Sequence, residues 1–160
     1  MTIELADVIA ETENNGKPWP PRFEPALHQR WTEGLAAGDK VKTALTAKIQ
    51  GLNPPTCSQG TAAMIACTSW GAWQILGETL YGGLWERSVF AFLTDPAAQR
   101  AAFEAFLAHH GVAFTLTDLV QDPAKRQRFI AAYNGPGDED AYWAKMKRAV
   151  KSLGGPVILA

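Results

Sequence analysis

The chain has 160 residues, a formal net charge of −1 and 47% apolar residues, a composition typical of soluble globular proteins. Its length permits one ordinary domain with a hydrophobic core, so we expect a single domain over residues 1–160. The charge balance argues against a nucleic-acid-binding protein, and the apolar runs fall short of the roughly 18 residues that a membrane span requires.

Helical spacing and helix-breaking residues divide the first half of the chain. Leu5, Val8 and Ile9 predict a helix from about residue 3 to residue 11. The acidic start of this segment lacks the basic flank of a signal peptide, so we expect synthesis in the cytoplasm. Further helices are expected over about 24–37, after a cap at Asp39 with Val41, Leu45 and Ile49 inward, and over 61–67.

Two Asp-Pro pairs mark helix starts in the second half, because aspartate caps a helix and proline suits its first position. They stand at Asp95-Pro96 and Asp122-Pro123. The helices expected here cover about 84–94 with Phe90 inward, 95–110, 122–134 and 138–152. Short strands are expected around residues 22–23 and 112–116. The pattern therefore predicts a mostly α fold with at most a minor β element.

The cysteines give no sign of a metal site. Cys57 and Cys67 lie ten positions apart, and no neighbouring Cys/His set has a zinc-ligand spacing. We expect free buried thiols, and a disulfide in an oxidising compartment is the alternative. The sequence also lacks a phosphate-binding loop and a nucleophile elbow, so we expect neither a metal nor another cofactor.

Polar and aromatic residues gather in two short segments. Residues 69–77 read Ser-Trp-Gly-Ala-Trp-Gln-Ile-Leu-Gly, and residues 133–135 read Tyr-Asn-Gly at the end of a predicted helix. A site for a polymer of N-acetylated sugars needs amides for acetamido groups and hydroxyls, aromatic faces for sugar rings and glycines for close backbone approach. The sequence therefore predicts a saccharide site, which a carboxylic acid at the end of the first helix would complete.

The order of these motifs resembles that of a known family. It runs from Glu11-Thr12 at a helix end, through a proline and glycine loop, to Phe23-Glu24, residues 69–77 and Tyr-Asn-Gly-Pro-Gly at 133–137. This order resembles the N-acetylmuramidase family of phage endolysins and related bacterial proteins, which is similar to the lysozyme and lytic-transglycosylase superfamily. The resemblance covers about residues 8–150 and is strongest at 68–77 and 132–137.

The resemblance implies a lysozyme-like domain with a substrate cleft, and we expect a monomer that needs no cofactor. Its implied substrate is the glycan strand of peptidoglycan, cut at the β-1,4 bond between N-acetylmuramic acid and N-acetylglucosamine. It also implies that the protein acts on the cell wall after release from the cytoplasm. A lytic transglycosylase that leaves anhydro ends and an inactive glycan-binding module are the alternatives.

Glu11 is the first candidate for the catalytic acid. Cleavage of a glycosidic bond needs a proton donor for the leaving oxygen. The edge of an apolar stripe and the negative end of a helix dipole both favour a protonated carboxyl. The alternative is a solvated acid in line with Glu4 and Asp7.

Glu24 is the second candidate carboxylate. It could orient a nucleophilic water, position the sugar or be the acid itself. The alternative is an acid beside Pro25 that satisfies free amides at a helix start. Glu13 is a weaker candidate, because we expect it in the loop that follows the first helix.

The remaining candidates would bind substrate. Gln74 and Asn134 could bind sugar amides or the attacking water, or could tie loops together. Tyr133 could hold the acid, stack on a sugar or pack in the core. The other candidates are Ser69, as a hydroxyl ligand or a turn cap, and Trp70 and Trp73, of which we expect one to be a ring platform and the other to be core.

Overall fold

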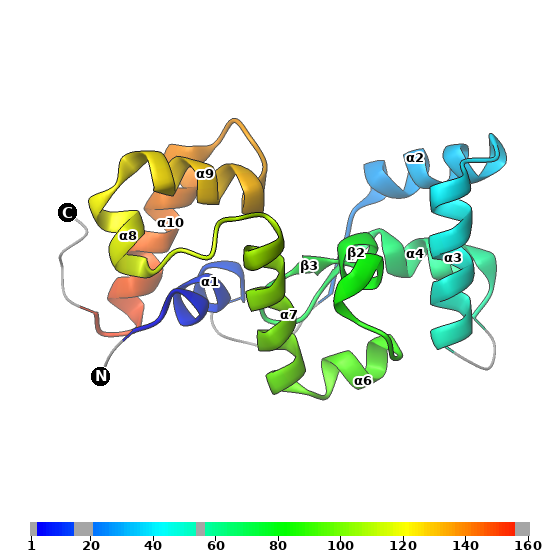
Figure 1. Cartoon of the computed structure of the whole chain (residues 1–160), viewed down its shortest axis with the longest axis horizontal. Coiled ribbons are helices and arrows are strands. Elements are labelled where there is room, and N and C mark those ends of the chain that lie inside the picture. Colours follow the sequence, from blue (N-terminus) through cyan, green and yellow to red (C-terminus); the bar gives the residue numbers. More distant parts are fainter. Residues whose placement is uncertain (1–2, 15–20, 54–56, 156–160) are drawn as a thin grey trace. The chain divides into compact units, whose positions relative to one another are not determined.

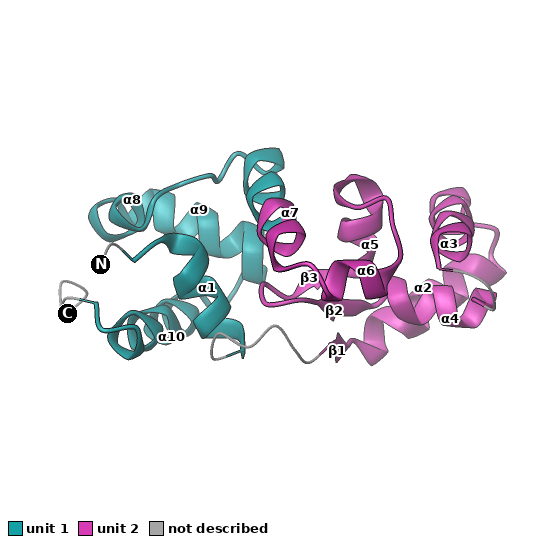
Figure 2. Cartoon of the chain, turned by 90° about the horizontal axis from the view of Figure 1, so that it is seen from below, with its two compact units in different colours: residues 1–17, 103–160 teal, residues 18–102 magenta. Residues whose placement is uncertain are grey.

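The computed structural model describes residues 3–14, 21–53 and 57–155 (Figure 1). Most of these residues are helical, which confirms the mostly α class with a minor β element. Contacts divide the chain into two compact units, one of residues 1–17 and 103–160 and one of residues 18–102 (Figure 2). The single domain over 1–160 stays a prediction.

The unit of residues 18–102 combines helices with a small antiparallel sheet. The sheet has the order β1-β2-β3, with Arg22 opposite Ser69 and Ser69 opposite Leu76. The strand expected at residues 22–23 is confirmed, and residues 68–76 form a β-hairpin that the sequence did not predict. The elements are β1 (Arg22–Phe23), α2 (Pro25–Ala36), α3 (Lys40–Leu52), α4 (Gln59–Ala66), β2 (Thr68–Trp70), β3 (Ile75–Leu76), α5 (Gly77–Thr79), the π-helix η1 (Leu80–Leu84), α6 (Val89–Leu93) and the first half of α7 (Pro96–His109).

Local capping and buried polar links hold these helices. Asp39 accepts hydrogen bonds from the first amides of α3, as expected, and Trp31 on α2 donates its indole N–H to Thr46 on α3. Asn53 at the end of α3 accepts from the amide of Val89 at 2.7 Å and donates to the hydroxyl of Tyr81. These buried amide contacts connect α3 with η1 and α6.

Two predictions in this unit are wrong because the helix register differs from the apolar pattern. Val41 is 76% exposed, whereas Ile49 on α3 is fully buried. The helix expected over residues 84–94 begins only at Val89, because Ser88 caps it by accepting from the amide of Ala91. In this register Phe92 is buried, and Phe90 is exposed rather than inward.

The unit of residues 1–17 and 103–160 is helical. Its elements are α1 (Leu5–Asn14), the second half of α7, α8 (Leu116–Gln121), α9 (Pro123–Asn134) and α10 (Glu139–Ser152). α1 packs along α10, with Val8 and Ile9 on α1 and Met146 on α10 fully buried.

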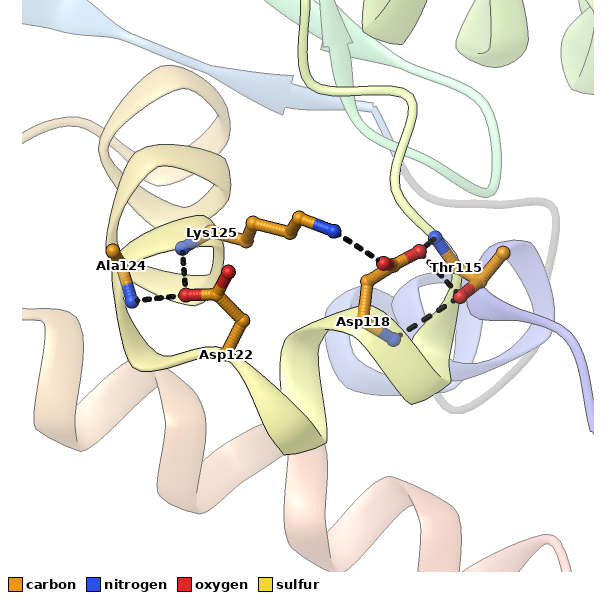
Figure 3. A network of polar contacts seen from close by, with 5 residues as sticks. All are labelled: Thr115, Asp118, Asp122, Ala124 and Lys125. Carbon is orange, nitrogen blue, oxygen red and sulfur yellow. Dashed lines mark hydrogen bonds and ion pairs between the residues drawn. The ribbon is translucent and has the colours of Figure 1, made fainter.

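A polar network defines the turn between α8 and α9 (Figure 3). Thr115 and Asp118 form a capping box at the start of α8, and Lys125 on α9 pairs with Asp118 at 2.6 Å. Hydrogen bonds from Lys125 and Thr115 hold the pKa of Asp118 well below its ordinary value. The strand expected at 112–116 is therefore wrong, because Thr115 already caps a helix there.

Both cysteines are free, Cys67 buried and Cys57 half-buried. Burial raises the pKa of the Cys67 thiol to about 11, so this thiol is protonated at neutral pH. In the described ranges no helix combines the length and the apolar character that crossing a bilayer requires.

Candidate functional site

Glu11 lies in the last turn of α1, which continues three residues further, to Asn14. Its side chain is half-buried, and its Oε1 accepts a hydrogen bond of 2.8 Å from the hydroxyl of Ser152. Ser152 is the last residue of α10. The structure thus gives the first candidate acid a partner that no local sequence signal identifies.

Glu13 lies in the same helical turn and not in a loop, so that expectation is wrong. α1 extends to Asn14, and within this turn Thr12 donates its hydroxyl to the carbonyl of Val8 at 2.6 Å. Glu13 Oε1 accepts a hydrogen bond of 2.6 Å from the hydroxyl of Tyr142, which is 2% exposed. This buried tyrosine ties α10 to α1, and we interpret the bond as a helix-to-helix link.

Tyr133 and Asn134 end α9, as the sequence predicts. The ring of Tyr133 contacts three phenylalanine rings with centroid distances of 5.8–5.9 Å, from Phe103, Phe106 and Phe129. It also lies 6.1 Å from the ring of Tyr142. The ring of Tyr133 is therefore packed among aromatic side chains, whereas the side chain of Asn134 is exposed.

Glu24 follows β1 and is anchored to the sheet. Its backbone N–H donates to the carbonyl of Cys67 at 2.9 Å, just before β2 begins. Its Oε1 accepts from Arg22 Nε at 2.8 Å, and its side chain is 39% exposed. Glu24 makes no side-chain cap to α2, so the alternative that it satisfies helix amides is wrong. It is an accessible carboxylate held by a guanidinium.

Gln74 occupies a strained position in the hairpin turn. Its φ of +46° lies in the left-handed region, where a residue with a Cβ costs about 1–3 kcal/mol. Its backbone N–H and its side-chain Nε2 both donate to the carbonyl of Gly71, at 3.1 and 3.0 Å. The side-chain amide thus supports the turn that presents it, and such strain is typical of functional sites.

A buried amide from α7 fixes this turn. Gln99 is 1% exposed; its Oε1 accepts from the amide of Ala72 at 2.9 Å, and its Nε2 donates to the carbonyls of Phe92 and Leu93. A Cβ on Gly71 would lie 2.6 Å from this Oε1. Sequence reasoning missed Gln99, because nothing in its local pattern distinguishes it from a surface glutamine.

The two tryptophans of residues 69–77 expose less ring surface for sugar stacking than the sequence suggests. Trp73 is 8% exposed, and Trp70 is half-buried with its indole N–H donated to the carbonyl of Ile65 at 3.0 Å. Ser69 is also buried, at 3%. In the sheet itself, Phe23 on β1 has a ring that is 41% exposed and lies 5.3 Å from the ring of His28.

A further carboxylate follows the hairpin directly. Glu78 in α5 is half-buried, and burial raises its pKa while the cations of Lys42 and Arg30 lower it. Its local sequence gives no sign of a functional role. The candidates divide by unit, with Glu11, Tyr133 and Asn134 in one and Glu24, Ser69, Trp70 and Gln74 in the other.

Each unit carries groups that can take part in acid–base chemistry and in polar recognition. They include carboxylates with defined partners, one side-chain amide in a tight turn, another at a helix end, and an exposed aromatic ring. Among the described residues, no three His, Cys, Asp or Glu side chains gather closely enough to hold a metal ion.

Comparisons with known proteins give a match to a family model and to a phage protein. The family model described as N-acetylmuramidase matches residues 10–154 of the chain. An endolysin of Enterobacteria phage PRD1 is 39% identical over 137 residues, which cover 84% of this chain and 88% of the phage protein. No solved structure matches the chain significantly.

Proposed function

The chain belongs to the N-acetylmuramidase family, and from this premise we propose that it hydrolyses the β-1,4 bond between N-acetylmuramic acid and N-acetylglucosamine. At the coarser level, it is a lysozyme-like glycoside hydrolase that degrades peptidoglycan. The cleaved bond and the two carboxylates that act on it, Glu11 and Glu24, are part of this proposal.

The proposed general acid is Glu11. The observation that carries this assignment is its place in the last turn of α1, half-buried and with one oxygen held by a hydroxyl. A carboxyl at such a place can give its proton to the glycosidic oxygen as the bond to the anomeric carbon breaks. Water then attacks the positively charged anomeric carbon and gives up a proton to a base.

Glu24 is the proposed second carboxylate. Arg22 holds its Oε1 at 2.8 Å, and the remaining exposure leaves the carboxylate accessible to solvent. Such a group can take a proton from the attacking water or stabilise the positively charged sugar. The separation of the two carboxylates in the substrate complex would decide the route, at about 6.5–9.5 Å for inversion and about 5–5.5 Å for retention.

The substrate-binding groups are proposed on the same chemistry. Gln74 and Asn134 offer amides to acetamido groups and hydroxyls, the first from a strained turn and the second from an exposed helix end. Phe23 offers an exposed ring beside Glu24 for stacking on a sugar. Ser69, Trp70 and Tyr133 then shape the site through packing and hydrogen bonds.

The proposed place of action is the cell wall, after release of the protein from the cell that makes it. This follows from the similarity to a phage endolysin and from the glycan substrate of the family. We propose purified peptidoglycan glycan strands as a sufficient substrate, without a metal or other cofactor.

Mass spectrometry of fragments released from purified Gram-negative sacculi tests the proposal. Hydrolysis yields fragments that end in reducing N-acetylmuramic acid. Fragments with 1,6-anhydro ends would overturn the hydrolytic route in favour of attack by the muramic 6-hydroxyl. Binding to sacculi without any released fragment would overturn the assignment of activity and leave a glycan-binding protein.

A further inference from the structure

We propose that Ser152 is a positioning residue for Glu11, holding Oε1 so that the proton to be donated resides on Oε2. The inference deepens the proposed function and rests on the assignment of Glu11 as the acid. The observation that carries it is the 2.8 Å hydrogen bond from Ser152 Oγ to Glu11 Oε1.

The hydroxyl is held at a defined place by the end of α10. The preceding residues Ala149 and Val150 are 5% and 4% exposed and anchor this end of the helix. Beyond Ser152, the amide of Leu153 donates to Ala149 and that of Gly155 to Val150, at 3.0 and 2.9 Å. The hydroxyl of Ser152 therefore projects from a helix end whose backbone is hydrogen-bonded and whose neighbouring side chains are buried.

The hydrogen bond from Ser152 decides which oxygen of Glu11 carries the acidic proton. A protonated carboxyl carries hydrogen on one oxygen and can accept a hydrogen bond at the other. Since Ser152 donates to Oε1, the neutral acid is directed to carry its proton on Oε2. During catalysis the Oε2–H bond breaks, the proton joins the glycosidic oxygen, and that oxygen keeps the electron pair of the broken bond to the sugar.

The same hydrogen bond strengthens as the reaction proceeds. A hydroxyl bonds more strongly to a carboxylate than to a neutral carboxyl, because the acceptor then carries charge. Glu11 gains that charge only as its proton leaves. An interaction that is stronger in the transition state than in the bound substrate raises kcat with little effect on KM. Because Ser152 is exposed, water can replace part of its effect.

The protein contains a matched control for this contact. Tyr142 donates its hydroxyl to Glu13 at 2.6 Å, so it joins the same two helices through the same kind of bond. Glu13 has no role in the proposed chemistry. Tyr142→Phe therefore measures how much a weaker attachment of α10 to α1 alone changes kcat.

The experiment compares Ser152→Ala, Ser152→Thr and Tyr142→Phe in the full chain, with initial rates measured against sacculus concentration. We expect Ser152→Ala to lower kcat about 3- to 10-fold with KM unchanged, the range that loss of one hydrogen bond gives. Ser152→Thr, which keeps a hydroxyl, should restore kcat, and Tyr142→Phe should leave it within about twofold. Thermal unfolding of each variant reports whether the fold persists.

Each contrary outcome has one meaning. Unchanged kcat in Ser152→Ala, or an equal fall in Ser152→Ala and Tyr142→Phe, would overturn the positioning role. A higher KM with unchanged kcat would do the same. Glu11→Gln separates this failure from failure of the proposed function, since an active Glu11→Gln enzyme would reject the acid itself, whatever Ser152 does.

Discussion

Arg22 lies directly opposite Ser69 across the ladder between β1 and β2. This pairing brings the Phe23-Glu24 segment to the hairpin of residues 68–76, although the two are far apart in the sequence. Because the backbone is extended from Arg22 to Glu24, these two side chains share a face, and Arg22 holds the carboxylate. One strand pairing therefore unites two of the motifs on which the functional proposal depends.

Replacement of Glu11 by glutamine should lower the rate of sacculus solubilisation at least about 100-fold, because the amide cannot donate a proton as a general acid. Glu13→Gln is the matched control, since Glu13 lies in the same turn and also accepts a hydroxyl from α10. It should stay within about threefold of the wild type. Equal losses in both variants would contradict a specific role for Glu11.

The ion pair between Arg22 and Glu24 predicts an ordered series of activities. Glu24→Gln should reduce kcat at least about 10-fold, because it removes the base or the stabilising charge. Arg22→Gln should reduce it less, since the carboxylate survives without its guanidinium partner. Glu33→Gln is the control, because Glu33 is an exposed carboxylate on α2 that accepts a hydrogen bond from the side chain of Gln29. Full activity in Glu24→Gln would restrict the chemistry to Glu11.

The hairpin turn should be sensitive to a single methyl group. Gly71→Ala places a Cβ 2.6 Å from buried Gln99 Oε1 and adopts a φ of +74°, so we expect a loss of about 1–3 kcal/mol in the free energy of unfolding. Gly51→Ala on α3 is the control, because nothing lies within 4 Å of its Cβ, and it should be neutral or slightly stabilising. Urea unfolding of both variants measures the difference.

The pKa of Asp118 predicts how stability depends on pH. Its folded pKa lies below the ordinary value of 3.8, mainly through the hydrogen bond from Lys125. A lowered folded pKa contributes stability above the ordinary value, and this contribution is lost as pH falls below it. The melting temperature of wild type should therefore exceed that of Asp118→Asn near pH 6, and the difference should shrink toward pH 2. A constant difference across this range would contradict the assignment.

Phe23 should contribute to glycan binding through its exposed ring. Phe23→Ala should raise KM about fivefold, as expected from loss of roughly 1 kcal/mol of ring contact. Phe90→Ala is the matched control, because Phe90 is more exposed, at 76%, and lies on α6 rather than in the sheet. Equal changes in both variants would show that the effect is not specific to Phe23.

Local chemistry made much of the helical architecture predictable. Asp39 caps α3 and the Asp122-Pro123 pair opens α9 as expected, because a cap satisfies amides only two or three residues away. Gly38, with a φ of +77°, follows α2 at the expected place. Exposure was less predictable, since Val41 and Phe90 fit an apolar stripe and yet lie outside.

The sequence by itself determined the mostly α class, most helix ends and the motif order that identifies the family. These depend on neighbours along the chain or on matches of residue type. Only the tertiary structure decided that Gln99 supports the hairpin turn and that Ser152 donates to Glu11. Hydrogen bonds between distant residues leave no periodic signal, because their geometry depends on how whole helices and strands pack.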